Sequence, residues 1–334
     1  MEEELSGDDL RVSIMKDTRL SLIPSFQGEK ETEEYYENIM QTAINEGDLS
    51  KFKQTVNKYK KPLKSVRNTE GETLLHICVK ARQKEILNYL LEVIEREFTD
   101  KEEFSHWLQE KIGRNKLSPL HIAAFYGNLH ALQKLTSLGV DPNTKTKFGL
   151  TVAHMAAQSN QPIPLVFFKE SKINMDLCIK DKVGDTPLHW ACKSGSVSAA
   201  LFLLKYYNQE EIDMGNSTGQ TPLHLAVESS VKSGDTSILK VILFAGANRN
   251  ERDRKARTPM DYLQELMKKN IVNEDTANDI IRILQNPKGS ECLMIKRPIK
   301  KILPSHKFSV IFLLALTGNL LLNSFIIIPC NFVS

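Results

Sequence analysis

A short pattern recurs along this chain and constrains its fold more than any other feature. It opens with Thr or Ser, and its clearest copies read "TPLH". The opening residues are Thr73, Ser118, Thr151, Thr186, Thr221 and Thr258. They are separated by 45, 33, 35, 35 and 37 positions. A period of this length is typical of a repeat architecture in which each unit is one supersecondary structure.

The residues of each copy carry the signals of a helix that starts abruptly. A Thr or Ser hydroxyl caps the first turn, and Pro at the first helical position has no hydrogen bond to lose. Small residues such as Ala123 and Ala124 follow, which allows neighbouring helices to approach closely. Later pairs such as Leu203 and Leu204 cannot be buried by one unit alone. The sequence therefore predicts an all-α stack of helix-turn-helix units.

At these residues the chain resembles the ankyrin repeat family, whose unit is Thr-Pro-Leu-His, a helix, a Gly, a second helix and a Gly-Ala-Asp/Asn loop. The resemblance is most specific in "GDTPLHWACKSGSVSAALFLLKYY". An earlier unit lacks the tetrapeptide but places Gly47 in phase. We therefore expect a solenoid of six to seven units over residues 35–286. The resemblance implies that its function is to bind another protein.

Irregular steps in the spacing should correspond to local changes in the helices. The 45-residue step has Phe104 and Trp107 at helical spacing, which predicts a lengthened second helix or an extra short one. Pro162 and Pro164 stand where a second helix should begin, so we expect that helix to start late and be short. The 37-residue step predicts a longer turn between its two helices. The residues after Thr258 predict a final helix pair.

Five histidines repeat in phase: His76, His121, His154, His189 and His224. Stacked units stand roughly 10 Å apart, the distance between packed helices, whereas zinc requires ligands at about 2 Å. We therefore predict that these side chains bond to the backbone of neighbouring loops and hold no metal. Trp190 takes a position that is Ile or Leu in other units, which predicts a core residue.

No motif in these 334 residues indicates catalysis or a cofactor. A Gly-rich phosphate loop, a Gly-x-Ser-x-Gly elbow and a His-Glu-x-x-His pair are all missing from the sequence. The five cysteines show no metal-ligand spacing, and a formal net charge of +3 with scattered basic residues argues against nucleic acid. An enzymatic role would therefore depend on residues outside this sequence.

The loop tips and the exposed positions of the first helices are the expected partner-binding face. Phe125 and Tyr126 are adjacent aromatics at such positions, and aromatics dominate interface hot spots. The alternative that one of them packs on the neighbouring unit stays open. Basic loop tips suggest an acidic protein partner or membrane headgroups. The candidates are Phe125, Tyr126, Lys145, Lys147, Gln158, Lys180, Lys182, Lys193 and Glu228.

The C-terminal part of the chain predicts one membrane span. Residues 308–328 contain no charged side chain, and 21 helical residues span about 31 Å, the thickness of a hydrocarbon core. The preceding linker, residues 287–307, is basic, which predicts a single-pass protein with its repeats in the cytosol. The membrane-proximal basic residues are Lys296, Arg297, Lys300, Lys301 and Lys307.

Two asparagines lie inside the expected span, one helical turn apart. Polar residues such as Asn319 and Asn323 usually face another helix, which predicts association of helices within the membrane. Residues 329–334 would form a short tail. At the other end, residues 1–34 hold ten acidic and four basic side chains without hydrophobic periodicity. They predict a disordered acidic arm.

These features predict a membrane-tethered adaptor or scaffold that holds a protein partner at the cytosolic face. An alternative follows from the order of repeats, basic linker and span, which resembles the front of ankyrin-bearing S-acyltransferases (palmitoyltransferases) of the Asp-His-His-Cys type. Their repeats recruit substrate proteins, but no Asp-His-His-Cys occurs in this sequence. A third candidate is the front of an ankyrin-bearing cation channel, although the short linker leaves little room for its coupling segment.

Overall fold

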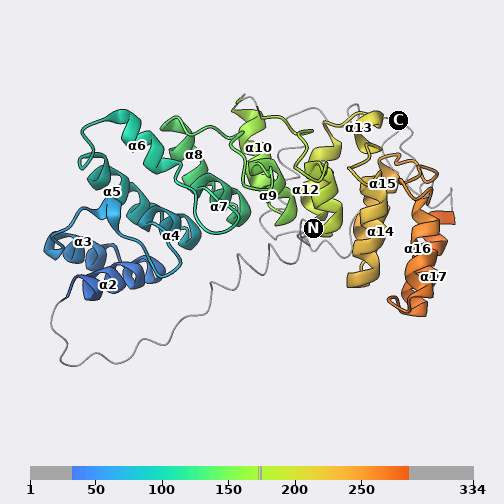
Figure 1. Ribbon diagram of the computed structural model, residues 1–334, viewed down its shortest axis with the longest axis horizontal. Helices are drawn as coiled ribbons and strands as arrows, with labels where there is room; N and C mark the ends of the chain where they lie inside the picture. The colour runs from blue at the N-terminus through green and yellow to red at the C-terminus, as the bar shows by residue number, and fades with distance from the viewer. Residues whose placement is uncertain (1–31, 172, 174, 286–334) are drawn as a thin grey trace, which may run out of the picture. The chain divides into compact units, whose positions relative to one another are not determined.

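The computed structural model describes residues 32–171, 173 and 175–285. Within these ranges the helices form seven consecutive pairs that follow one another in chain order (Figure 1). The pairs are α2 (Glu33–Glu46) with α3 (Leu49–Lys58), α4 (Leu74–Ala81) with α5 (Lys84–Glu95), α7 (Pro119–Tyr126) with α8 (Leu129–Ser137), α9 (Val152–Gln158) with α10 (Pro162–Glu170), α11 (Pro187–Lys193) with α12 (Val197–Leu204), α14 (Pro222–Ser233) with α15 (Ser237–Phe244), and α16 (Pro259–Lys268) with α17 (Glu274–Gln285).

Three short helices lie outside these pairs, namely η2 (Leu63–Ser65), α6 (Lys101–Leu108) and α13 (Gln209–Ile212). Extended pairing in the described part of the chain is limited to two isolated bridges. The prediction of an all-helical solenoid with up to seven units is therefore confirmed for the part that the structure describes. Its first helix begins at Glu33, two residues before the boundary we expected.

The core consists of small residues between the first helices and larger apolar residues on the second helices. Ala123, Ala156 and Ala191 are fully buried, so α7, α9 and α11 lie close together. Leu203 on α12 and Ile242 on α15 are equally buried. Each unit therefore depends on its neighbours to remove its apolar side chains from water.

The first long step contains both a longer second helix and an additional one. The helix α5 has 12 residues, and α6 follows it over Lys101–Leu108. Phe104 and Trp107 stack with their ring centroids 6.4 Å apart, and the Trp107 Nε1–H donates to the Lys64 carbonyl at 3.2 Å. The predicted insertion is confirmed, and the hydrogen bond from Trp107 to the Lys64 carbonyl attaches it to the array.

Our prediction for the two prolines of the fourth unit is wrong. The helix α10 begins at Pro162 and has nine residues, as many as α8. Both Pro162 and Pro164 lie in its first turn, where backbone N–H groups have no intrahelical acceptor. Proline therefore starts this helix without the loss of a hydrogen bond.

The 37-residue step is also arranged differently from the prediction. Its additional residues lengthen the first helix, α14, to 12 residues, whereas α11 has seven. Gly234 ends α14 with φ +74°, and only two residues separate it from the start of α15. The physical reason is that Ser230 and Val231 are buried, so packing continues the helix for another turn.

The final helix pair is confirmed as α16 and α17. The predicted arm, basic linker, membrane span and tail lie outside the described residues, except that Thr32, Glu33 and Glu34 of the arm belong to the start of α2. Lys296, Arg297, Lys300, Lys301, Lys307, Asn319 and Asn323 lie outside them as well. None of the helices in the described ranges combines the length and the apolar character needed to cross a bilayer.

Candidate partner-binding face

A tight turn precedes the first helix of units two to seven, and we call its five residues a tip. The tips, numbered one to six, are residues 68–72, 113–117, 146–150, 181–185, 216–220 and 253–257. In tip 4 the Gly184 N–H donates to the Asp181 carbonyl at 3.1 Å, and the Asp181 N–H donates to the Asp185 carbonyl at 3.0 Å. The fourth residue of every tip has a positive φ, for example +82° at Gly184 and +55° at Lys116.

Backbone hydrogen bonds join the second to sixth tips, and we call these five tips the tip row. The second residue of each tip donates its N–H to the third residue of the tip before it. The bonds are Lys147 to Asn115 (3.0 Å), Lys182 to Phe148 (3.0 Å), Ser217 to Val183 (3.0 Å) and Arg254 to Thr218 (2.9 Å). The tip row is therefore ordered by its own backbone.

The five in-phase histidines connect each unit to the next one. Their Nδ1 atoms lie 2.7–3.0 Å from the hydroxyl of the capping Thr or Ser. Their Nε2 atoms lie 3.0–3.2 Å from the carbonyls of Glu110, Leu150, Asp185, Gln220 and Arg257. A carbonyl only accepts, so Nε2 carries the proton. The predicted structural role is confirmed.

Burial keeps these imidazoles neutral. It lowers the pKa of His76, His154 and His189 to about 3 and that of His121 to about 4. The pKa of His224 is also lowered by burial. In the part of the chain that the structure describes, no group of His, Cys, Asp or Glu side chains is placed to hold a metal ion.

Tip 4 is braced from inside by a buried carboxylate. Asp181 Oδ1 accepts from the backbone N–H groups of Val183 and Asp185, and Oδ2 accepts from Trp190 Nε1 at 2.8 Å. Burial, followed by the charge of Asp185, raises the pKa of Asp181 to about 6. Trp190 is only 3% exposed, as predicted, and Lys193 Nζ lies 5.3 Å from its ring centroid.

Two of the candidate contact residues are not on the surface. Phe125 is 4% exposed, with its ring centroid 5.4 Å from that of Tyr126, and Gln158 is fully buried. The reason is that α7 and α9 are packed between neighbouring first helices, so even their last turns are covered. These two positions are corrected to core positions. Tyr126 is half-buried and remains accessible.

The basic tip candidates are exposed and lie in register. Lys147 and Lys182 are the second residues of tips 3 and 4, and Lys145 and Lys180 directly precede these tips. All four are exposed. The structure therefore brings together the tip lysines that the sequence indicated as a basic surface.

Lys193, the last residue of α11, and Glu228, in the middle of α14, are half-buried. Glu228 receives a hydrogen bond from the Tyr262 hydroxyl at 2.9 Å and pairs with Lys232 at 2.9 Å. Glu228 is thus engaged within the array, which makes Lys193 the more accessible of the two for a partner.

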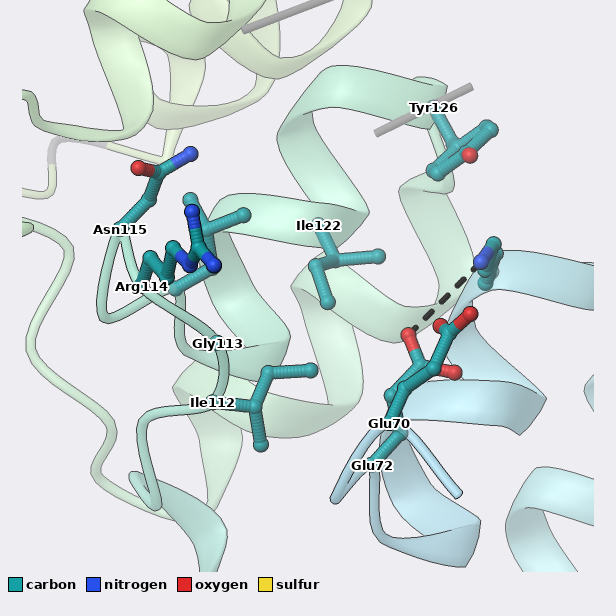
Figure 2. Close-up of a pocket in the computed structure, with 10 residues that line it drawn as sticks. Glu70, Glu72, Ile112, Gly113, Arg114, Asn115, Ile122 and Tyr126 are labelled. Atoms are coloured by element: carbon teal, nitrogen blue, oxygen red, sulfur yellow. Dashed lines mark ion pairs between the residues drawn. The ribbon is translucent and has the colours of Figure 1, made fainter. Parts of the chain in front are cut away.

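A pocket of about 350 Å³ lies between tips 1 and 2 (Figure 2). Ile112, Leu117 and Ile122 give it an apolar floor. Glu70 and Glu72 stand on one side and Arg114 on the other, and Lys80 pairs with Glu72 at 3.7 Å. Tyr126, the last residue of α7, lies at one end of the pocket.

Of the residues that line this pocket, only Tyr126 was predicted from the sequence as a contact residue. Tip 2 has Lys116, not the Gly of most other tips, at the fourth position, where φ is positive. The alignment of tips by their capping residue places Arg114 in the same position as Lys147 and Lys182. Counting back four residues from Ser118 would have identified it.

Comparison with known proteins identifies the repeat. A family model described as "Ankyrin repeats (3 copies)" matches residues 39–146, 120–214 and 154–253. The crystal structure of the ankyrin repeat domain of Bcl-3, described as "a unique member of the IkappaB protein family", is similar with a TM-score of 0.48 and 19% identity. The match covers 73% of this chain and 97% of that one. No curated protein matches. The acyltransferase and channel alternatives thus stay predictions from segment order.

Proposed function

We propose that this chain, which belongs to the ankyrin repeat family of protein–protein interaction modules, is an adaptor that is tethered to a membrane. In this proposal the tip row and the neighbouring first helices hold a protein partner, and residues 308–328 anchor the chain with its repeats in the cytosol. The tip row carries the proposal of a binding face, because it presents exposed side chains on an ordered backbone.

The proposed tether is supported by the sequence alone. Fourteen of the 21 residues in 308–328 are Leu, Ile, Val or Phe, each of which favours insertion by roughly 0.3 to 0.6 kcal/mol. The basic linker before them favours retention of the repeats on the cytosolic side and contact with anionic lipids. Residues 287–328 lie outside the described ranges.

A comparison of the full chain with a chain that lacks 308–334 tests the tether. After alkaline carbonate extraction of cell membranes, the full chain should remain in the pellet and the shortened chain in the supernatant. A matched control replaces Lys296 and Arg297 by Gln, which should leave pelleting intact. Equal pelleting of the full and shortened chains would show that these residues are not the anchor.

Site-specific cross-linking tests the binding face independently of the membrane. A photoreactive residue at Lys182 should cross-link a defined protein, whereas the same residue at Lys58, exposed on α3 in the first unit, should not. Cross-links of equal yield from both positions would contradict the assignment of the tip row as the binding face.

A further inference from the structure

The exposed cations of the tip row occupy repeating positions. The second residue is Arg114, Lys147, Lys182 or Arg254 in tips 2, 3, 4 and 6. The residue immediately before the tip is Lys145, Lys180 or Arg252 in tips 3, 4 and 6. All seven are exposed. Tip 5 has Ser217 and Gly215 at these positions and carries no charge there.

The acidic side chains of these tips do not neutralise this row. Asp181 and Asp185 are 8% and 4% exposed, and Asp253 is 6% exposed and pairs with Arg257 at 2.6 Å. Among the residues that the structure describes, none of the seven cations forms an ion pair with an acidic side chain. Within this part of the chain no ion pair therefore neutralises their charges, although Arg252 interacts electrostatically with the Asp261 carboxylate.

Several of these cations are already held in place by the array itself. Lys180 Nζ donates to the Gly215 carbonyl at 3.2 Å, and Arg252 donates to the Ala256 carbonyl at 2.6 Å. Lys147 Nζ lies 5.8 Å from the ring centroid of Phe148. Together with the backbone bonds between tips, these contacts reduce the freedom that a ligand would have to remove.

The spacing of the row matches an extended chain. Packed helices lie about 10 Å apart, and a polyproline II segment advances about 3.1 Å per residue with three residues per turn, so its side chains three residues apart lie on the same face. Three residues of an extended segment therefore correspond to one step of the row. Acidic side chains three residues apart would meet Arg114, Lys147 and Lys182 in turn.

The charge changes sign at the first tip, which argues against a flat anionic surface as the ligand. Glu70 is exposed at the position that corresponds to Asn115 in tip 2. A bilayer that covered all the tips would meet the Glu70 carboxylate, whereas a narrow segment can end before it.

We propose that the tip row binds an extended acidic segment of a partner protein, with acidic residues at every third position along tips 2 to 4. This inference rests on the proposed function as a protein-binding module and specifies the chemistry of the partner. The tip cations supply the complementary charge, and the pitch of the repeat sets the register.

Binding of labelled peptides to the full chain in a nonionic detergent tests the inference. The probe is a 13-residue peptide with Glu at every third position among Gly and Ser, measured by fluorescence anisotropy. Controls are the same composition with its Glu residues adjacent, and a peptide with Gln in place of Glu. We expect the spaced peptide to bind at least about fivefold more tightly than the clustered one, and the Gln peptide not to bind. Raising the salt from 0.05 to 0.5 M should weaken binding, because the charges are exposed.

Charge reversal identifies the surface. A Lys147→Glu, Lys182→Glu variant should bind the spaced peptide about tenfold more weakly. A Lys58→Glu, Lys240→Glu variant has the same net charge, alters exposed lysines on α3 and α15, and should change binding by less than about threefold.

Three results would overturn the inference. They are no binding of the spaced peptide, equal losses in the two charge-reversal variants, and binding only to vesicles that contain phosphatidylserine. If the peptide fails while Lys182 still cross-links a defined protein, the acidic chemistry is wrong and the binding module stands. If both fail, the proposed function fails as well.

Discussion

At the scale of single residues, the in-phase histidines show how one side chain joins two units. Each imidazole accepts at Nδ1 within its own unit and donates from Nε2 to a carbonyl 29 to 34 residues further along the chain. Both nitrogens are used, and in four of the five units the backbone N–H of the cap also donates to Nδ1, which therefore carries no proton. A proton on Nδ1 would therefore break the contact with the cap.

These histidines make the stability depend on pH. Burial lowers their pKa in the folded state, so below pH 6.5 the unfolded chain takes up protons first and stability is lost as the pH falls. Each should cost about 1.4 kcal/mol at pH 5.5. Asp181 acts in the opposite sense, because its raised pKa of about 6 stabilises the folded state as the pH falls towards 4.

The measurement is urea unfolding between pH 7.5 and 5.5 for the natural chain and His154→Gln. The variant should be less stable at pH 7.5, and between pH 7.5 and 5.5 its stability should fall by about 1.4 kcal/mol less than that of the natural chain. Parallel pH profiles would mean that His154 titrates normally in the folded protein.

Substitutions of the tip glycines distinguish two effects on stability: the strain of a positive φ, and the steric clash of a new Cβ with the backbone of the next tip. In Gly184→Ala the new Cβ would lie 2.7 Å from the Ser217 N, whereas in Gly71→Ala no atom lies within 4 Å. Both positions have a positive φ, +82° and +78°, which costs about 1 kcal/mol. We expect Gly71→Ala to lose about that amount and Gly184→Ala at least about 2 kcal/mol, measured by urea unfolding. Equal losses would show that the backbone contact between tips adds nothing.

The role of a residue could be predicted from the sequence where its position in the repeat has the same surroundings in every unit. The histidines and Trp190 follow the phase of the repeat, so their burial could be read from it. Phe125 could not be assigned in the same way, because a position at the end of a short helix is exposed or covered according to the helices on either side. Here α4 and α9 flank α7 and cover that position.

At the scale of elements, the location of an insertion was easier to predict than its form. The 45-residue step correctly indicated an extra helix, because Phe104 and Trp107 showed helical spacing. The 37-residue step lengthened α14, since additional residues extend a helix when they can be buried. Pro162 was misjudged because proline breaks a helix interior but is compatible with its first turn.

The attachment of α6 can be tested through Trp107. Trp107→Ala removes a side chain that is 6% exposed and should cost about 3 kcal/mol. Trp107→Phe keeps most of the ring stacking, loses the bond to the Lys64 carbonyl and should cost about 1 kcal/mol. Hydrogen exchange of the α6 amides should accelerate in the Ala variant. Unchanged exchange would show that α6 is held by other contacts.

At the scale of the whole array, stability is a sum over units and their contacts, because each unit touches only its neighbours. The fifth unit, α11 with α12, has partners on both sides, and the pair of α16 and α17 ends the described array. Loss of a buried residue at the end can therefore unfold the end pair alone.

Leu188 on α11 and Leu263 on α16 are both fully buried and provide a matched comparison. Leu188→Ala should lower the global unfolding free energy by about 2–5 kcal/mol. Leu263→Ala should lower it less and should produce an early, separate loss of helical signal in urea unfolding followed by circular dichroism. A single sharp transition in both variants would indicate that the end pair unfolds only together with the rest.

The backbone bonds between tips have a thermodynamic consequence for any partner. Lys147, Lys182, Ser217 and Arg254 use their amides to order the row before a ligand arrives. The array then has little conformational entropy left to lose on association. The entropy change measured by calorimetry should report mainly the flexibility of the incoming segment. Two partners with the same charges but different stiffness would then differ in affinity because of their own chains.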